Sequence, residues 1–114
     1  MNTKTLYSPV NQAELDLIMD LQYKAFPPRL AEQPIFYPVL NENYAIEITT
    51  KWNVPYYGSG YVTEFDVDAD YLSQFEEKIV GGPQHVELWI PAEELENFNA
   101  HIVGTIRVSH SFPT

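Results

Sequence analysis

The 114-residue chain contains no cysteine, and this absence excludes several kinds of chemistry at once. Without thiols there is no disulfide scaffold, no cysteine nucleophile and no zinc site that depends on thiolate ligands. Basic residues are also scarce: 6 lysines and arginines stand against 16 acidic residues, for a formal net charge of −10. The basic residues are isolated from one another in sequence, whereas binding a phosphate backbone requires clustered positive charge. We therefore expect no nucleic-acid partner.

Long hydrophobic runs are missing as well. No segment approaches the roughly 20 apolar residues needed to cross a membrane, and the first residues lack the apolar stretch of a secretory signal. We therefore expect a cytoplasmic protein with no membrane partner. Apolar and aromatic residues are plentiful, at 45% and 14% of the chain, as in a globular domain with a packed core. Since no internal repeat or long linker interrupts the sequence, residues 1–114 are predicted to form a single domain.

Two main helices are predicted in the first half of the chain. Asn11 can cap one over about residues 12–21, and Glu14, three residues further on, resembles the partner in a capping box. The second helix begins after Asn41 and is predicted to end near Trp52. Their core-facing stripes are Leu15, Ile18, Met19 and Gln22 in the first helix, and Tyr44, Ala45, Ile48 and Trp52 in the second.

Alternating apolar residues and turn signals predict the strands. They are expected over residues 5–10, 61–67, 78–80, 86–90 and 101–108. A turn is predicted over residues 53–60, Asp68 can cap a single helical turn, and Pro91 suits the first position of a short helix. Together these elements predict a compact α+β domain with a mainly antiparallel sheet.

Residues 26–40 hold four of the nine prolines and one of only two arginines, Arg29. Proline fixes φ and removes a backbone donor, which excludes an ordinary helix or a central strand here. We interpret the first two prolines as holding Arg29 outside regular structure, and Pro34 and Pro38 as bracketing a short extended edge. Two explanations stay open. The loop either aims Arg29 at a ligand or is a rigid crossover that packs apolar residues into the core: Phe26, Leu30 and Phe36.

Glu87 is the acidic residue that most needs an explanation, because it interrupts an apolar segment over residues 86–90. It either points to water, as strand alternation allows, or lines a cleft. His85 lies two residues earlier on the same face and is a candidate to orient Glu87 or a ligand. The three histidines lack metal-ligand spacing, so no metal site is predicted, and the serines show no nucleophile pattern.

Several segments together resemble a known group of proteins. The chain is similar over nearly its whole length to small bacterial proteins labelled ADP-ribosylation/crystallin-type, in residues 6–10, 25–30, 33–41, 52–53 and 89–95. The order of its predicted elements also resembles the ADP-ribosyltransferase-like fold. The resemblance implies a domain that binds NAD or an ADP-ribose-like ligand and that transfers ADP-ribose. The glycohydrolase half of the label implies a large helical enzyme with two metals, which 114 residues cannot build.

In the transferase family, three positions form the nicotinamide pocket: a basic residue on the first strand, an aromatic or serine in the second segment, and a glutamate on a later strand. The resemblance assigns these positions to Ser8, Tyr37 and Glu87. It implies that Tyr37 stacks on nicotinamide and that Glu87 stabilises positive charge developing on the ribose. Ser8 departs from the pattern because it is not basic. Arg29 is the nearby residue able to replace that contact by binding the diphosphate, and His85 is a further ligand-binding candidate.

A second hypothesis belongs to a different class of protein. The charge of −10, together with Ser8 in place of a basic residue, also fits a non-catalytic module that binds a protein partner. Such a module would use an acidic surface rich in aromatic residues. Release of nicotinamide from NAD distinguishes the two hypotheses, because a transferase releases it during the reaction and a non-catalytic module does not.

Overall fold

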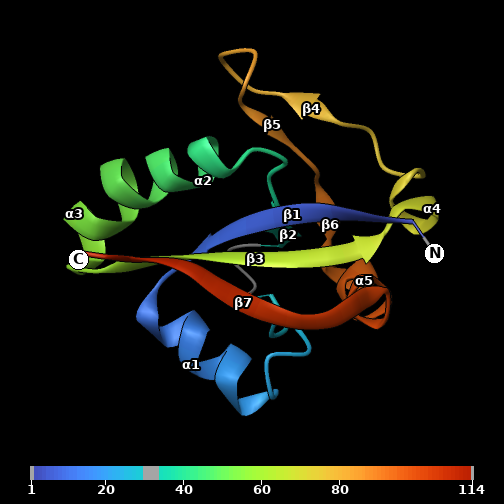
Figure 1. Ribbon diagram of the computed structural model, residues 1–114, viewed down its shortest axis with the longest axis horizontal. Coiled ribbons are helices and arrows are strands. Elements are labelled where there is room, and N and C mark those ends of the chain that lie inside the picture. Colours follow the sequence, from blue (N-terminus) through green and yellow to red (C-terminus); the bar gives the residue numbers. More distant parts are fainter. Residues whose placement is uncertain (1, 30–33, 114) are drawn as a thin grey trace.

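The computed structural model of the protein describes residues 2–29 and 34–113. Its central feature is a three-stranded antiparallel sheet with the strand order β1-β3-β7, which runs across the middle of Figure 1. The three strands are β1 (Thr3–Val10), β3 (Gly60–Asp68) and β7 (Ile102–Phe112). Val62 and Phe65 point to opposite faces of β3 and are both fully buried, as expected for a central strand covered on both sides.

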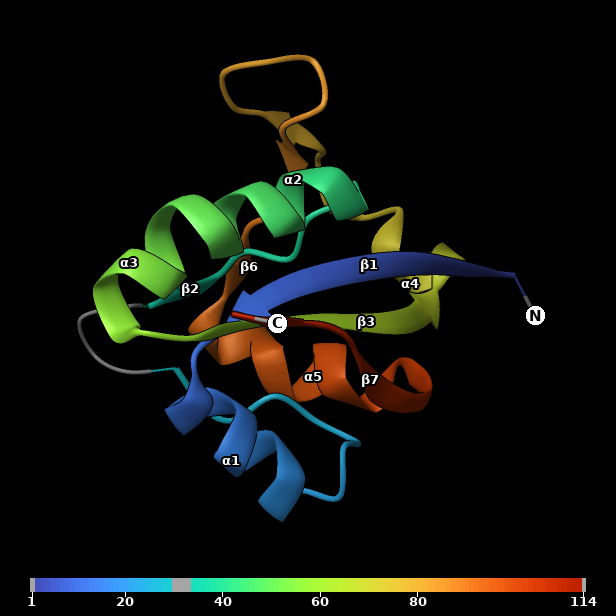
Figure 2. The same ribbon diagram turned by 60° about the vertical axis from the view of Figure 1, so that its left-hand side comes forward.

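Helices cover both faces of this sheet (Figure 2). One face carries α1 (Gln12–Asp20) and α5 (Leu95–Ala100), and the other carries α2 (Glu42–Ile48), the π-helical turn η1 (Thr49–Asn53) and α3 (Val54–Tyr57). The shorter elements are α4 (Ala69–Leu72), the 3-10 turn η2 (Ala92–Glu94), β2 (Ile35–Phe36), β4 (Lys78–Ile79), β5 (Val86–Glu87) and β6 (Ile90–Pro91). The radius of gyration is 13.3 Å, close to the roughly 13 Å of a compact domain of this size. The predicted α+β class with antiparallel pairing is therefore confirmed.

The proline-rich segment joins the central sheet to β5. Val39 forms antiparallel bridges to Tyr7 on β1 and to Glu87 on β5. Pro38 takes part through its carbonyl, which accepts a 2.9 Å hydrogen bond from the Leu88 amide, so its missing N–H costs nothing there. Among the described residues, β2 pairs with β6 alone and is an edge, as predicted. Val39 is bridged on both sides, so the exclusion of a central strand was wrong at that residue.

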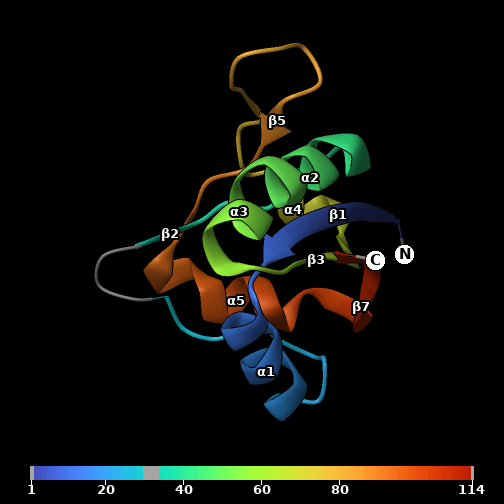
Figure 3. The same cartoon turned by 90° about the vertical axis from the view of Figure 1, so that its left-hand side faces the viewer.

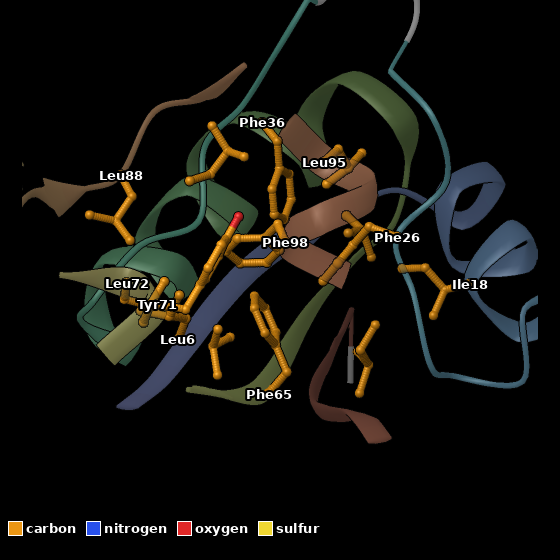
Figure 4. Close-up of a cluster of buried hydrophobic side chains, with 14 of the residues drawn as sticks. Leu6, Ile18, Phe26, Phe36, Phe65, Tyr71, Leu72, Leu88, Leu95 and Phe98 are labelled. Carbon is orange, nitrogen blue, oxygen red and sulfur yellow. The ribbon is translucent and has the colours of Figure 1, made fainter. Parts of the chain in front are cut away.

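The larger hydrophobic core lies on the α1 and α5 face of the sheet and is called the α5-side core below. Phe98 lies between Phe36 and Phe65 near its centre (Figure 4). Phe26 also enters it, as one of the two interpretations of the proline loop predicted, whereas Leu30 lies outside the described residues. A smaller group, the α2-side cluster, has the buried members Val39, Ala45 and Val62.

The start of α1 was predicted only in part. The Asn11 side chain caps the helix by accepting a hydrogen bond from the Glu14 amide at 2.8 Å. A full capping box would also have the Glu14 carboxylate accept a hydrogen bond from the Asn11 amide. The Glu14 carboxylate instead accepts one from Arg29. Leu15 and Ile18 are buried as predicted. Met19 is 48% exposed, because only a narrow side of this short helix touches the core.

The end of the second helix was predicted wrongly. The helix does not stop near Trp52 but continues through η1 and α3 to Tyr57, and Gly58, with a φ of 85°, ends it. In the π-helical turn the Val54 amide donates to the Thr49 carbonyl, five residues back. This wider turn moves Trp52 off the apolar stripe, which explains why it is 70% exposed.

The predicted strand over residues 86–90 is also interrupted. It is divided into β5 and β6, each of which pairs with a different strand: β5 with β4, and β6 with β2. Two smaller predictions were also wrong. Residues 53–57 of the predicted turn are helical, and Pro91 ends β6 and precedes the first helical residue, Ala92, as its cap. The single turn of α4 is capped by Asp68 as predicted, with its side chain accepting from the Asp70 amide. In the described part of the chain, no helix is long and apolar enough to cross a membrane.

Candidate functional site

A pocket opens where the sheet divides between β1 and β2. The Tyr7 amide and carbonyl bond to Val39, but beyond this point β1 runs beside α2 and η1 and leads into α1, while the proline segment turns toward β6. Figure 3 shows this end of the molecule, with the tip of β1 between α3 and α1 and with β2 to one side. The pocket has a volume of about 470 Å³, within the range of small-molecule sites. Its lining is Ser8, Pro9, Glu14, Arg29, Phe36, Tyr37, Val39, Ile48, Asn53, Glu87 and Trp89.

Four of the five candidate residues meet in this pocket. Ser8, Arg29, Tyr37 and Glu87 all line it, although they are spread over 80 positions of sequence and lie on different segments. His85 is not among the lining residues. Within the described residues, no group of three or more His, Asp or Glu side chains is arranged to hold a metal ion.

Glu87 is held in place by two hydrogen bonds, one to each carboxylate oxygen. The Tyr44 hydroxyl donates to Oε2 at 3.2 Å, and the Trp89 indole N–H donates to Oε1 at 2.7 Å. Burial raises the pKa of Tyr44, and the charge of Glu87 raises it further, so the hydroxyl keeps its proton and acts as a donor. Hydrogen bonds to both oxygens fix the plane of the carboxylate at the pocket wall.

Arg29 and Glu14 form an ion pair on the pocket wall. Arg29 Nη1 lies 3.3 Å from Glu14 Oε2, and the two side chains are 13% and 23% exposed. The guanidinium also lies 5.5 Å from the centre of the Phe36 ring, in cation–π contact. Burial raises the pKa of Glu14, and the charge of Arg29 opposes that rise. The guanidinium is therefore already paired with an anion of the protein itself.

Ser8 occupies the position at which the resembled family carries a basic residue. It is only 5% exposed, because β1 is covered on this face. Its carbonyl accepts a 2.7 Å hydrogen bond from the Thr63 hydroxyl, which ties it to β3. A serine there can offer a neutral hydroxyl but no charge, so Arg29 is the cation that lines the pocket among the described residues.

The π-helical turn supplies a lining residue that periodicity cannot predict. Ile48 and Asn53 are five positions apart and both line the pocket, as expected where the turn widens to i→i+5. The Thr49 hydroxyl donates to the Ala45 carbonyl at 2.8 Å, an interaction that competes with regular helical bonding. The turn also packs closely on Gly60, where a β-carbon would lie 2.7 Å from a methyl group of Thr49. Only glycine fits at that contact.

Two aromatic side chains provide flat apolar surface in the pocket. Tyr37 and Trp89 are 46% and 44% exposed, and their rings meet edge to face with centroids 6.0 Å apart. The Lys78 ammonium lies 5.3 Å from the centre of the Trp89 ring. Exposed aromatic faces of this kind can stack on a planar ligand ring.

His85 instead connects the β4–β5 hairpin to α2. Its ring stacks on Tyr44 at 4.3 Å between centroids, and its Nε2 lies 3.1 Å from Glu47 Oε2. Because the same tyrosine bonds to Glu87, His85 supports the residue that positions the pocket carboxylate. Its observed contacts are therefore with the wall behind Glu87.

Sequence reasoning missed several lining residues, above all Glu14 and Asn53. Glu14 was interpreted as a capping residue and Asn53 as part of a turn, and neither carries a local signal for a pocket. No protein-family model, curated protein sequence or solved structure matches this chain. Its function has to be inferred from the pocket itself.

Proposed function

We propose that the pocket binds the nicotinamide end of NAD, or an ADP-ribose-like ligand, in a domain of the ADP-ribosyltransferase-like type. The observation that carries this proposal is the meeting of Ser8, Arg29, Tyr37 and Glu87 in one cavity. The sequence resemblance assigned Ser8, Tyr37 and Glu87 to the ligand pocket, and Arg29 was the residue expected to replace the missing basic contact; neither step made use of positions in space. Tyr37 offers a ring face to nicotinamide, and Glu87 offers a fixed negative charge beside it.

The reaction that follows from this arrangement is transfer of ADP-ribose. The bond between the ribose carbon and the nicotinamide nitrogen breaks, and its electron pair leaves with nicotinamide, which becomes neutral. Positive charge then develops on the ribose, where the Glu87 carboxylate stabilises it. An acceptor nucleophile forms the new bond to the ribose carbon and loses a proton. With water as acceptor, the products are ADP-ribose, nicotinamide and a proton.

Two features of the site support this reaction, one at Glu87 and one in the size of the pocket. Its two hydrogen bonds hold the carboxylate in one orientation, which is what electrostatic stabilisation of a transition state requires. The pocket volume of about 470 Å³ also suits one ring and its ribose.

The test is to incubate the protein with about 1 mM NAD, the upper end of common KM values, and to measure free nicotinamide by mass spectrometry. We expect Glu87→Gln to slow its release by about 100-fold or more, because the variant removes the charge that favours the transition state. The control is Glu93→Gln, which removes the same charge from an exposed residue outside the pocket and leaves the rate unchanged. If the wild-type protein neither binds nor cleaves NAD, the proposal is wrong.

A second candidate function, a non-catalytic protein-interaction module, is favoured by one observation. Trp52, Tyr56 and Tyr57 are 70%, 81% and 51% exposed on the η1–α3 segment, and exposed aromatics are enriched at protein interfaces. The NAD experiment separates the two candidates, because an interaction module has no reason to release nicotinamide or to depend on Glu87.

A further inference from the structure

The charged side chains of the pocket do not suit an anion. Glu14, Arg29 and Glu87 line it, so one positive charge stands against two negative charges. Arg29 is also paired with Glu14 at 3.3 Å, and a phosphate placed beside the guanidinium would meet that carboxylate too. Water screens such a contact poorly where the side chains are largely buried. The predicted contact of Arg29 with a diphosphate is therefore unfavourable while Glu14 is ionised.

The hydrogen-bonding capacity of the pair favours another kind of group. An arginine side chain only donates hydrogen bonds, and an ionised glutamate only accepts them. Arg29 and Glu14 therefore place a donor and an acceptor side by side on one wall of the pocket. A primary carboxamide presents the complement, with an accepting oxygen next to a donating N–H₂, whereas a carboxylate presents two acceptors.

We propose that the Arg29–Glu14 pair recognises a primary carboxamide on an aromatic ring and discriminates against the corresponding carboxylate. The amide oxygen accepts from Arg29, the amide N–H₂ donates to Glu14, and the ring lies against the aromatic side chains of the pocket. This inference rests on the proposed function, since it specifies which end of an NAD-like ligand enters. The diphosphate then stays outside, away from both carboxylates.

The probes that test this inference are nicotinamide and nicotinate, which share a ring and differ in the group that the pair would recognise. Their binding to the full chain is measured by NMR titration of the protein amides, and neither probe requires NAD cleavage. We expect the wild-type protein to bind nicotinamide at least about tenfold more tightly, because nicotinate would leave Glu14 facing a second carboxylate.

The decisive variant is Glu14→Gln, which keeps the size of the side chain, removes its charge and adds an N–H₂ donor. We expect the preference for nicotinamide to fall to about threefold or less, because a glutamine can donate to the carboxylate of nicotinate. The matched control is Asp16→Asn on the same helix, which removes the same charge from an exposed residue outside the pocket lining. It is expected to retain the full preference.

The inference is overturned if the wild-type protein binds both probes equally or binds neither. It is also overturned if Glu14→Gln leaves the preference unchanged, or if Asp16→Asn abolishes it. The proposed function fails separately. Cleavage of NAD without a preference for the amide would keep the transferase proposal and reject this inference. A preference for the amide without NAD binding or cleavage would keep this inference and reject the transferase proposal.

Discussion

The two faces of the central sheet are held together by different interactions. In the α5-side core, fifteen of the described apolar residues are buried in one cluster, and phenylalanine rings meet at short distances. Phe26 lies 4.7 Å from Phe36 and 4.8 Å from Phe65, measured between ring centroids. The α2-side cluster has three buried members. This face is therefore stabilised much less by apolar burial.

Polar contacts take the place of apolar packing on the α2 side. Glu47 binds both Lys51 and His85 at 3.0 and 3.1 Å, and Tyr44 bonds to Glu87. The Lys51 ammonium group is on a side chain that is 65% exposed, so water and salt compete for that contact. Contacts of this kind contribute little stability and open readily.

The candidate pocket lies at the junction of these two regions. Phe36 and the Arg29–Glu14 pair belong to the tightly packed side, whereas Ile48, Asn53 and Glu87 are carried by the less packed side. The difference indicates which wall can adjust to a ligand. We expect α2, η1 and the β4–β5 hairpin to move on binding and the α5 side to stay fixed.

The largest expected effect comes from the α5-side core. Phe65→Ala should lower the free energy of unfolding by about 3–5 kcal/mol, because it removes a fully buried ring that contacts other rings. Urea denaturation followed by circular dichroism measures the change. A loss below about 1 kcal/mol would show that this core is not the main source of stability.

Two valines on β3 provide the control for this experiment, because both are fully buried but face opposite sides. Val67→Ala removes apolar volume from the α5-side core, and Val62→Ala removes the same volume from the α2-side cluster. Each change should cost about 2 kcal/mol from lost burial, and Val67→Ala should cost more because the tightly packed side relaxes less. A larger loss for Val62→Ala would reverse the comparison.

The two arginines give an intermediate effect. Arg29→Met should lower the free energy of unfolding by about 2 kcal/mol, because it leaves the largely buried Glu14 carboxylate without its partner. Arg107→Met is the control. Arg107 is 44% exposed beside Glu64 and Asp66, so its removal should cost less than about 1 kcal/mol. Equal losses of unfolding free energy for the two variants would contradict the distinction between the largely buried Arg29–Glu14 pair and the exposed Arg107 pairs.

The pH dependence of Arg29→Met follows from the pKa of Glu14. Burial raises that pKa and Arg29 lowers it, so removing Arg29 raises it further. A carboxyl group with a raised folded-state pKa favours folding when protonated and loses that contribution as the pH rises through the folded-state pKa. The loss caused by Arg29→Met should therefore be larger at about pH 7 than at about pH 5. Denaturation at both pH values measures this difference.

Local sequence signals predicted those parts of the fold that depend on local chemistry. Asn11 and Asp68 cap helices because a short side chain can reach nearby amides, and no tertiary contact is needed. The alternation of side chains over residues 61–67 predicted β3 because it is likewise a local pattern that can be recognised without tertiary contacts. Trp52 was placed wrongly because helical spacing assumes 3.6 residues per turn, and one π-helical turn changes which side chains face the core.

The candidate site was predictable only in part. Tyr37 and Glu87 could be named from the resemblance, but their meeting with Arg29 depends on Val39 joining β1 to β5. Glu14 had no local signal, because its partner Arg29 lies 15 positions away across two prolines. Whether a carboxylate caps a helix or pairs with a buried arginine is decided by the tertiary fold alone.

The smallest expected effect is on the α2 side, where Tyr44→Phe removes the hydroxyl that donates to Glu87 and leaves the ring stacked on His85. The free energy of unfolding should fall by about 1 kcal/mol or less, because one partly exposed hydrogen bond is lost. Hydrogen exchange should nevertheless become faster in residues 78–87, since the hairpin loses a bond that holds it to α2. Tyr71→Phe removes the comparable hydroxyl bond to Glu94 on the α5 side and should leave exchange in the hairpin unchanged. If both variants leave it unchanged, or both accelerate it, the polar contacts of the α2 side do not control the mobility of the wall that carries Glu87.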